Sequence, residues 1–314
     1  MNPLVDPLHA GIAGVTMEMS EFDLGEGLVL RQTFAHFMAP FLMAFAPAEG
    51  GKPHPAPWSA VSGGLGFDIN VELFVPASFN RPRFFDRLNT VWWITALIRL
   101  RGGFRAHAPV IADRPFAEIP KDWKNAAMLP VEILERKMFG KSVLERLTLP
   151  DLMWLKEKWL RGGQLMNEQP KLNDAFQALD AAGSLPNPAV SLLAVWGALE
   201  HLFSPAKQEL RFRVSANIAA YLESHGQTRL NLHRRLMKLY DARSGVAHGV
   251  KTDSFEAWSE TFAIANQILI KILDSGEVPT KDSLEKQLFA GAIVSEPSSL
   301  ESNSDMNGEA DSIH

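Results

Sequence analysis

Residues 239–249 read LYDARSGVAHG and end a long pattern of helical periodicity. In this stretch Arg243 is followed by the polar Ser244 and, after four intervening residues, by His248. A pattern of arginine, four to six residues and histidine is not specific, because the chain contains it twice elsewhere, at Arg31 with His36 and at Arg101 with His107. The surroundings of Arg243 must therefore decide whether the pair has a function.

Arg243 is predicted to lie on an apolar helical face. At 100° per residue counted from Leu232, Leu236 falls at about 40°, Val246 at about −40° and Arg243 at about 20°. An unpaired guanidinium on a buried face costs several kcal/mol. Arg243 therefore either forms an internal ion pair, with Glu200 or Glu209, or faces an interface or a ligand. Both alternatives remain open at this point.

His248 falls about 140° from Arg243 on an ideal helix, so the two side chains need not meet within one chain. Gly245 and Gly249 can distort or end the helix there. Two copies of the helix packed across a two-fold axis would bring both pairs around one cleft. Asp241, seven residues before His248, shares its face and is a candidate to orient the imidazole.

The same segment carries a local excess of positive charge. Between Arg229 and Lys251 there are six lysines and arginines and one acid, in a chain of net charge −5. Such a strip beside a histidine suits a phosphate-rich ligand, with Arg234, Arg235 and Lys238 as candidate contacts. The alternative for Arg234 and Arg235 is that they are simply solvated.

The wider chain predicts an α+β protein with a mixed α/β region at residues 1–147 and an all-α bundle at 148–276. In the first region, 26–33 and 67–73 have strand patterns, 84–101 has a helical pattern, and the Pro- and Gly-rich 46–66 is predicted to be a long loop. The Trp92–Trp93 pair is interpreted as core rather than as a base-stacking platform. Helices are expected at 148–162, 171–182, 187–203, from Pro205 to about 222, 228–248 and 255–273, joined by short connections that favour an antiparallel bundle. Residues 277–314 are expected to form a largely disordered acidic tail.

Composition favours a soluble cytoplasmic protein. The chain has 46% hydrophobic residues and no cysteine, which excludes disulfides and thiolate chemistry and fits a reducing compartment. The N-terminus lacks the features of a signal peptide, and the apolar stretch 37–48 is interrupted by two prolines and is too short to span a bilayer. No histidine and carboxylate cluster has metal-ligand spacing: His225 and His233, for example, are eight residues apart.

The motif LYDARSGVAHG, together with the upstream segment WGALEHLF at residues 196–203, resembles the Apea-like group of the HEPN superfamily. The signature of this family is an arginine followed by a polar residue and, after four to six residues, a histidine. Arg243, Ser244 and His248 match that signature. Glu200 matches an acidic position that the family often carries. The resemblance covers roughly residues 150–275 and implies a helical bundle that forms a homodimer.

The resemblance also implies a metal-independent endoribonuclease that needs no cofactor. His248 would be the general acid or base, while Arg243 and Ser244 would hold the scissile phosphate. RNA would be the partner, in phage defence or with an antitoxin partner. Two alternatives remain open: a non-catalytic RNA-binding or regulatory module, and a scaffold in which an Arg243–Glu200 pair is purely structural.

Overall fold

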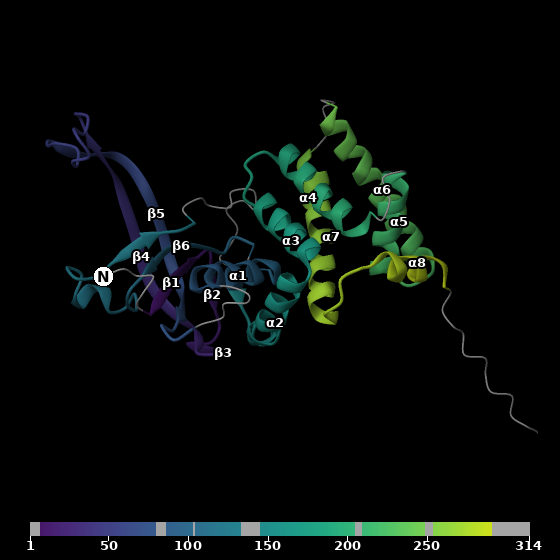
Figure 1. Ribbon diagram of the computed structural model, residues 1–314, viewed down its shortest axis with the longest axis horizontal. Coiled ribbons are helices and arrows are strands. Elements are labelled where there is room, and N and C mark those ends of the chain that lie inside the picture. Colours follow the sequence, from purple (N-terminus) through teal and green to yellow (C-terminus); the bar gives the residue numbers. More distant parts are fainter. Residues whose placement is uncertain are drawn as a thin grey trace, which may run out of the picture.

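The computed structural model describes residues 7–79, 86–102, 104–132, 145–204, 209–248 and 254–290. A β-rich region containing helix α1 (Arg87–Leu100) is followed by an all-α region, so the predicted α+β class is confirmed (Figure 1). The region following β8 (Glu145–Leu147) is helical from α2 (Leu149–Glu168) onward.

The main sheet has six strands in the order β3-β4-β5-β1-β6-β7, and every neighbouring pair is antiparallel. A separate parallel pair joins β2 to β8, which brings the end of the β-rich region back to its beginning. The strands are β1 (Leu8–Ala13), β2 (Val15–Met17), β3 (Glu21–Gly25), β4 (Leu28–Ala44), β5 (Trp58–Val75), β6 (His107–Ala112) and β7 (Met128–Pro130), with a short 3-10 helix at Ile119–Lys121.

The alternation in segment 67–73 predicts that Phe67, Ile69, Val71 and Leu73 lie on one face of a strand. All four are buried, but they do not share one face. Val71 and Leu73 belong to the main core, whereas Ile69 packs in a smaller cluster with Val110 and Phe116. The pairing of β5 with both neighbours shifts between Ile69 and Val71. Such a bulge changes which face the following residues occupy.

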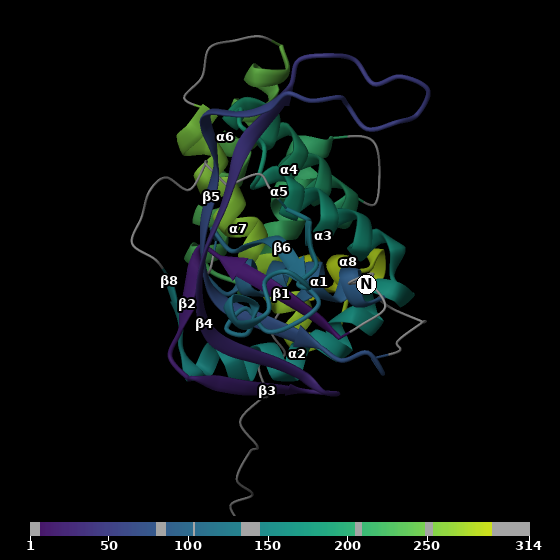
Figure 2. The ribbon, with the colours of Figure 1, turned by 90° about the vertical axis from the view of Figure 1, so that its left-hand side faces the viewer.

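The predicted long loop at residues 46–66 is wrong for residues 58–66, which form the first half of β5. They pair with the end of β4, for example Phe41 with Val61 and Ala44 with Trp58. The two strands run 17 and 18 residues and leave the body of the sheet as a long hairpin (Figures 1 and 2). Glycine and proline weaken a strand, but this cross-strand pairing outweighs them.

The helices of the second region lie close to their predicted bounds. They are α3 (Pro170–Ala182), α4 (Pro188–Phe203), α5 (Leu210–Leu222), α6 (Gln227–Ala247) and α7 (Ser254–Ser275). The helical spacing of apolar residues in α4 predicts a buried stripe, and all of its members are fully buried: Leu192, Val195, Trp196, Leu199 and Leu202. The expected start of the next helix at Pro205 lies outside the described residues. Of the apolar residues that this helix carries, Val214 and Ile218 are buried, whereas Phe212 is 57% exposed.

Helix α2 does not stop at Gly162–Gly163, contrary to expectation, and continues to Glu168. A Cβ on Gly162 would lie 2.9 Å from Leu273 of α7 and 3.1 Å from Trp93 of α1. Glycine is required here for close helix packing, so it does not end the helix. The cost of glycine in a helix, about 1 kcal/mol, is offset by the contacts made by the neighbouring residues.

The expected disordered tail from residue 277 is wrong for residues 281–289, which form helix α8 (Lys281–Phe289). Thr280 and Ser283 form a capping box at its start, and Leu284 is buried. Arg229 of α6 donates a hydrogen bond to the carbonyl of Gln287. These tertiary contacts stabilise a helix too short to form alone. Residues 291–314 lie outside the described part of the chain.

One hydrophobic core extends from Leu8 in β1 to Leu284 in α8 and joins the two regions. Trp93 of α1 is fully buried and donates to the carbonyl of Trp159 in α2, while Trp92 packs against the core and donates to Asp180 of α3. The interpretation of the tryptophan pair as core is confirmed.

Candidate functional site

Arg243 of α6 forms an ion pair with Glu200 of α4. Its Nη2 lies 3.3 Å from the carboxylate, and the two side chains are 27% and 19% exposed. Glu209, the other partner considered for Arg243, pairs with Arg213 instead. The internal-pair alternative for Arg243 is therefore the one that the fold contains, with Glu200 as the partner.

Two aromatic side chains complete this cluster. The guanidinium of Arg243 lies 5.3 Å from the ring centre of Tyr240, and Tyr240 meets Trp196 edge-on at 5.0 Å. Burial, together with the hydrogen bond and negative charge of Glu200, raises the pKa of Tyr240, although Arg243 opposes this effect. Tyr240 is not among the predicted site residues, although it lies three residues before Arg243 and helical spacing could have indicated it.

Arg243 keeps hydrogen-bonding capacity beyond the Glu200 contact. Its Nε is buried without a hydrogen-bond partner among the described residues. A guanidinium has five N–H donors, and the contact with Glu200 uses only the Nη2 end. Glu200 and Tyr240 therefore orient a cation that could still bind an anion.

His248 lies at the C-terminal end of α6 with its side chain exposed. Of the two glycines that can end the helix, Gly245 does not: α6 continues to Ala247, and the backbone N–H of His248 donates to the carbonyls of Ser244 and Gly245 at 3.1 and 3.2 Å. The ideal-helix estimate of about 140° between Arg243 and His248 therefore applies, with about 7.5 Å of rise. A single copy of α6 does not point both side chains at one place. Gly249 lies outside the described residues.

Asp241 does not orient His248 in the described structure. Its carboxylate accepts a 2.5 Å hydrogen bond from Arg211 of α5. The pairing of Arg211 with Asp241 could not be predicted from the sequence, because Arg211 lies thirty residues before Asp241 and on another helix. Ser244 is half-buried and lies between the two main candidates along α6.

The basic strip is smaller than its sequence indicated. Arg235 is paired with Glu260 of α7, and Arg229 donates to the backbone carbonyls of Glu223 and Gln287. Lys251 lies outside the described residues.

Arg234 and Lys238 are exposed and have no ion-pair partner within the described part of the chain. With His248 they fall within an arc of about 80° on one side of α6, along about 21 Å of helix. This outward face, formed by Arg234, Lys238 and His248 together with Asp241, whose charge is paired with Arg211, is called the outer face of α6 below.

The other two arginine–histidine spacings have structural explanations. Arg31 pairs with Glu21, and His36 with Asp68, in the β-rich region. Arg101 binds Asp151 and lies over the ring of Trp154. Neither spacing forms a site.

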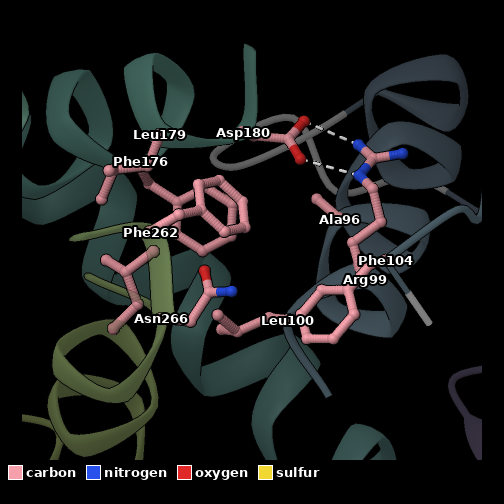
Figure 3. Close-up of a pocket in the computed structure, with 10 residues that line it drawn as sticks. Ala96, Arg99, Leu100, Phe104, Phe176, Leu179, Asp180, Phe262 and Asn266 are labelled. Atoms are coloured by element: carbon pink, nitrogen blue, oxygen red, sulfur yellow. Dashed lines mark hydrogen bonds and ion pairs between the residues drawn. The ribbon is translucent and has the colours of Figure 1, made fainter. Parts of the chain in front are cut away.

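A cavity between α1, α3 and α7 is bordered by a second buried ion pair (Figure 3). Arg99 holds Asp180 with two hydrogen bonds of 2.7 and 2.6 Å and also donates to the carbonyl of Ala106. The cavity has about 20 Å³ of water-sized space, enough for a single water. Arg99 and Asp180 therefore tie the β-rich region to the bundle rather than bind a substrate.

Comparisons with known proteins add no relative: no family model, curated protein or solved structure matches the chain. Within the described ranges, no three histidine, aspartate or glutamate side chains gather closely enough to hold a metal ion. In the same residues, no helix is both long and apolar enough to traverse a bilayer. The family resemblance therefore depends on residues 196–203 and 239–249 of this sequence alone.

Proposed function

We propose that the helical region is a HEPN-type, metal-independent endoribonuclease. The observation that carries the proposal is the position of His248, exposed at the end of α6 on the same face as Arg234 and Lys238, two cations that have no ion-pair partner among the described residues. A basic face that leads to an exposed imidazole suits a polyanion whose chemistry needs proton transfer.

In the proposed reaction, His248 accepts the proton of a ribose 2′-hydroxyl, and the 2′-oxygen attacks the adjacent phosphorus. The bond to the 5′-oxygen breaks, and that oxygen takes up a proton, giving a 2′,3′-cyclic phosphate and a 5′-hydroxyl. The guanidinium of Arg243 would stabilise the developing charge on the phosphate oxygens, and Ser244 would donate a further hydrogen bond. DNA lacks the nucleophile and should not be cut.

The proposed site needs two chains. Because Arg243 and His248 point about 140° apart on one helix, a homodimer through the helical region would bring Arg243 of one copy near His248 of the other. Glu200 and Tyr240 would then keep the guanidinium oriented before RNA binds.

The test uses the full chain and an end-labelled single-stranded RNA in EDTA, with a DNA of the same sequence beside it. We expect RNA cleavage that His248→Ala abolishes and His225→Ala, at the exposed turn before the other end of α6, preserves. Absence of cleavage, or equal cleavage by His248→Ala, would reject the enzyme. In cells, toxicity of the wild type that His248→Ala relieves, with fragmented RNA, would support a role in phage defence or with an antitoxin.

A second candidate is a non-catalytic RNA-binding or regulatory module. It is favoured by the absence, among the described residues, of a carboxylate that orients His248, since Asp241 is bound to Arg211. RNA binding without turnover would identify this function. The third possibility, a scaffold, predicts that Arg243→Ala loses stability while RNA binding is unchanged.

A further inference from the structure

The outer parts of β4 and β5, with the loop between them, form a hairpin arm at residues 33–66 that stands away from the body (Figures 1 and 2). Pairing of β4 with β3 ends at Arg31, and pairing of β5 with β1 ends at Ile69. Among the described residues, both outer edges of the arm therefore lack a neighbouring strand. A two-stranded ribbon of this kind is only marginally stable in water.

The arm exposes an unusual number of large apolar side chains. Six of them are 50–72% exposed: Phe34, Met38, Phe41, Leu42, Phe45 and Trp58. Successive strand residues point to opposite faces, so Phe41 lies on one face, while Leu42 and Trp58 lie on the other. At the base of the arm, Ala35 and Phe37 pack against the small cluster around Ile69, but at Phe41, Leu42 and Trp58 both faces are open to solvent.

The exposed area matches a protein interface in size. At about 200 Å² for each large side chain, the six residues leave roughly 700 Å² accessible. A typical monomer has a largest apolar patch of about 300–600 Å², and a standard interface buries about 800 Å² on each partner. The six side chains together approach the area that one partner contributes to a stable complex, and a partner must contact both faces of the arm to bury all of them.

The distribution of charge along the arm indicates whether a lipid bilayer or a protein surface covers it. Between Phe37 and Phe67 the formally charged residues are Glu49 and Lys52, and both lie in the loop at the tip. A bilayer entered tip first would have to accept both charges, at several kcal/mol. The apolar shaft with a polar tip instead suits another protein surface.

Among protein partners, a second copy of this chain is the one that best matches the arm. A two-fold contact places the same patch against itself, so any net charge would repel its own image. The shaft is uncharged in a chain of net charge −5, and its open strand edges offer the N–H and C=O groups that another copy of the arm needs. We propose that the arms of two copies pair around a two-fold axis and bury each other's apolar side chains.

This contact is separate from the helical-region dimer of the proposed function. The first test joins Met38 to Gly66, which are paired across the strands, through an Asn-Gly turn in place of residues 39–65. Light scattering at micromolar concentration should show that the mass of the particle halves, with the circular dichroism of the helices retained. An oligomer whose mass is unchanged by the deletion overturns the arm contact alone and leaves the proposed function to its own test. A wild-type monomer overturns the arm contact and also counts against the helical-region dimer of the proposed function.

Point variants separate apolar contact from loss of structure. Leu42→Glu and Trp58→Glu should each shift the protein toward the smaller species, whereas Phe289→Glu, at an 82% exposed position on α8, should not. Equal effects of all three variants would contradict an arm-specific contact.

The absence of cysteine allows a direct test of proximity. Ala60→Cys on the arm should give a covalent dimer under mild oxidation, and Lys281→Cys on α8 should not. A monomer that binds phosphatidylglycerol vesicles through the arm would instead reject the second copy in favour of a lipid surface.

Discussion

The guanidinium of Arg243 and the carboxylate of Glu200 lie 3.3 Å apart across helices α6 and α4, on faces that are otherwise apolar. The pair is largely shielded from solvent, and the ring of Tyr240 packs against the guanidinium. The ion pair therefore stabilises the contact between α4 and α6. Under the proposed function it also orients the guanidinium that would contact RNA.

The structural use can be measured by a double-mutant cycle. Arg243→Ala should lower the free energy of unfolding by about 1–3 kcal/mol, because it leaves a partly buried carboxylate without its partner. Adding Glu200→Gln should recover part of this loss, with a coupling of at least about 0.5 kcal/mol in urea denaturation. The exposed pair Arg213–Glu209 is the control, and its cycle should give about 0.5 kcal/mol or less. Additive effects at Arg243 and Glu200 would show that the pair contributes nothing.

Tyrosine titration reports on the same cluster, because the chain has only two tyrosines. Burial raises the pKa of Tyr221 to about 12, so Tyr221→Phe leaves Tyr240 as the sole signal in the ultraviolet titration. The pKa of Tyr240 should lie above its usual value and should fall when Glu200→Gln removes the neighbouring negative charge. A titration unchanged by Glu200→Gln would contradict the contact between these two side chains.

Packing around the glycines of the bundle gives two opposite predictions. Gly162→Ala should destabilise the fold by about 1–3 kcal/mol, because the new methyl group would crowd Leu273 and Trp93. Gly197→Ala, in the exposed middle of α4 with nothing near its Cβ position, should stabilise it by about 0.5–1 kcal/mol. Thermal or urea unfolding of both variants checks the pair, and the same sign for both would contradict the close packing of α2 against α1 and α7.

Lowering the pH should reduce the stability of the fold at the N-terminal end of α2, because Asp151 becomes protonated. Burial alone would raise the pKa of Asp151, but hydrogen bonds from Thr148 and the ion pair with Arg101 outweigh it and hold this pKa below its usual range. Ionised Asp151 therefore stabilises the fold at neutral pH, and the contribution falls as pH drops below about 4 and through the lower folded-state pKa.

The variant Asp151→Asn isolates this contribution. It should cost about 1 kcal/mol at pH 7, as for other capping interactions, and the deficit relative to wild type should shrink as the pH approaches about 2. Unfolding in urea at several pH values measures it. A deficit that stays constant across that range would exclude Asp151 ionisation as its cause.

The outer face of α6 predicts the salt dependence of RNA binding. Each of Arg234→Ala and Lys238→Ala should weaken binding and reduce the slope of log K against log salt by about 0.7, the value for one phosphate contact on a single strand. Fluorescence anisotropy with labelled RNA at several KCl concentrations measures the slope. Arg235→Ala, at a site already paired with Glu260, should change the slope less, and Lys281→Ala on α8 should not change it. Equal slopes in all the variants would place the RNA elsewhere.

Local sequence patterns were sufficient for most of the helices. The stripe of α4, the bounds of α3, α6 and α7 and the β-capable segments at 26–33 and 67–73 follow from periodicity of neighbouring residues. The apolar surroundings of Arg243 also led to Glu200 as one of two possible partners, because a buried cation needs a carboxylate.

Distant partners decided the rest. The Gly162–Gly163 pair is typical of a helix end, but Gly162 lies inside α2, where it allows close packing against Trp93 and Leu273. The glycines and prolines of residues 46–66 predict a loop, but residues 58–66 form a strand because they pair with β4. The fold likewise assigned Asp241 to Arg211 and Arg235 to Glu260, which reduced a basic strip to two unpaired cations among the described residues. The sequence by itself determined which residues have helical or strand character and which charge needs a partner. Only the tertiary structure decided which partner each charge found, because ion pairs and strand pairing join residues that lie tens of positions apart in the chain.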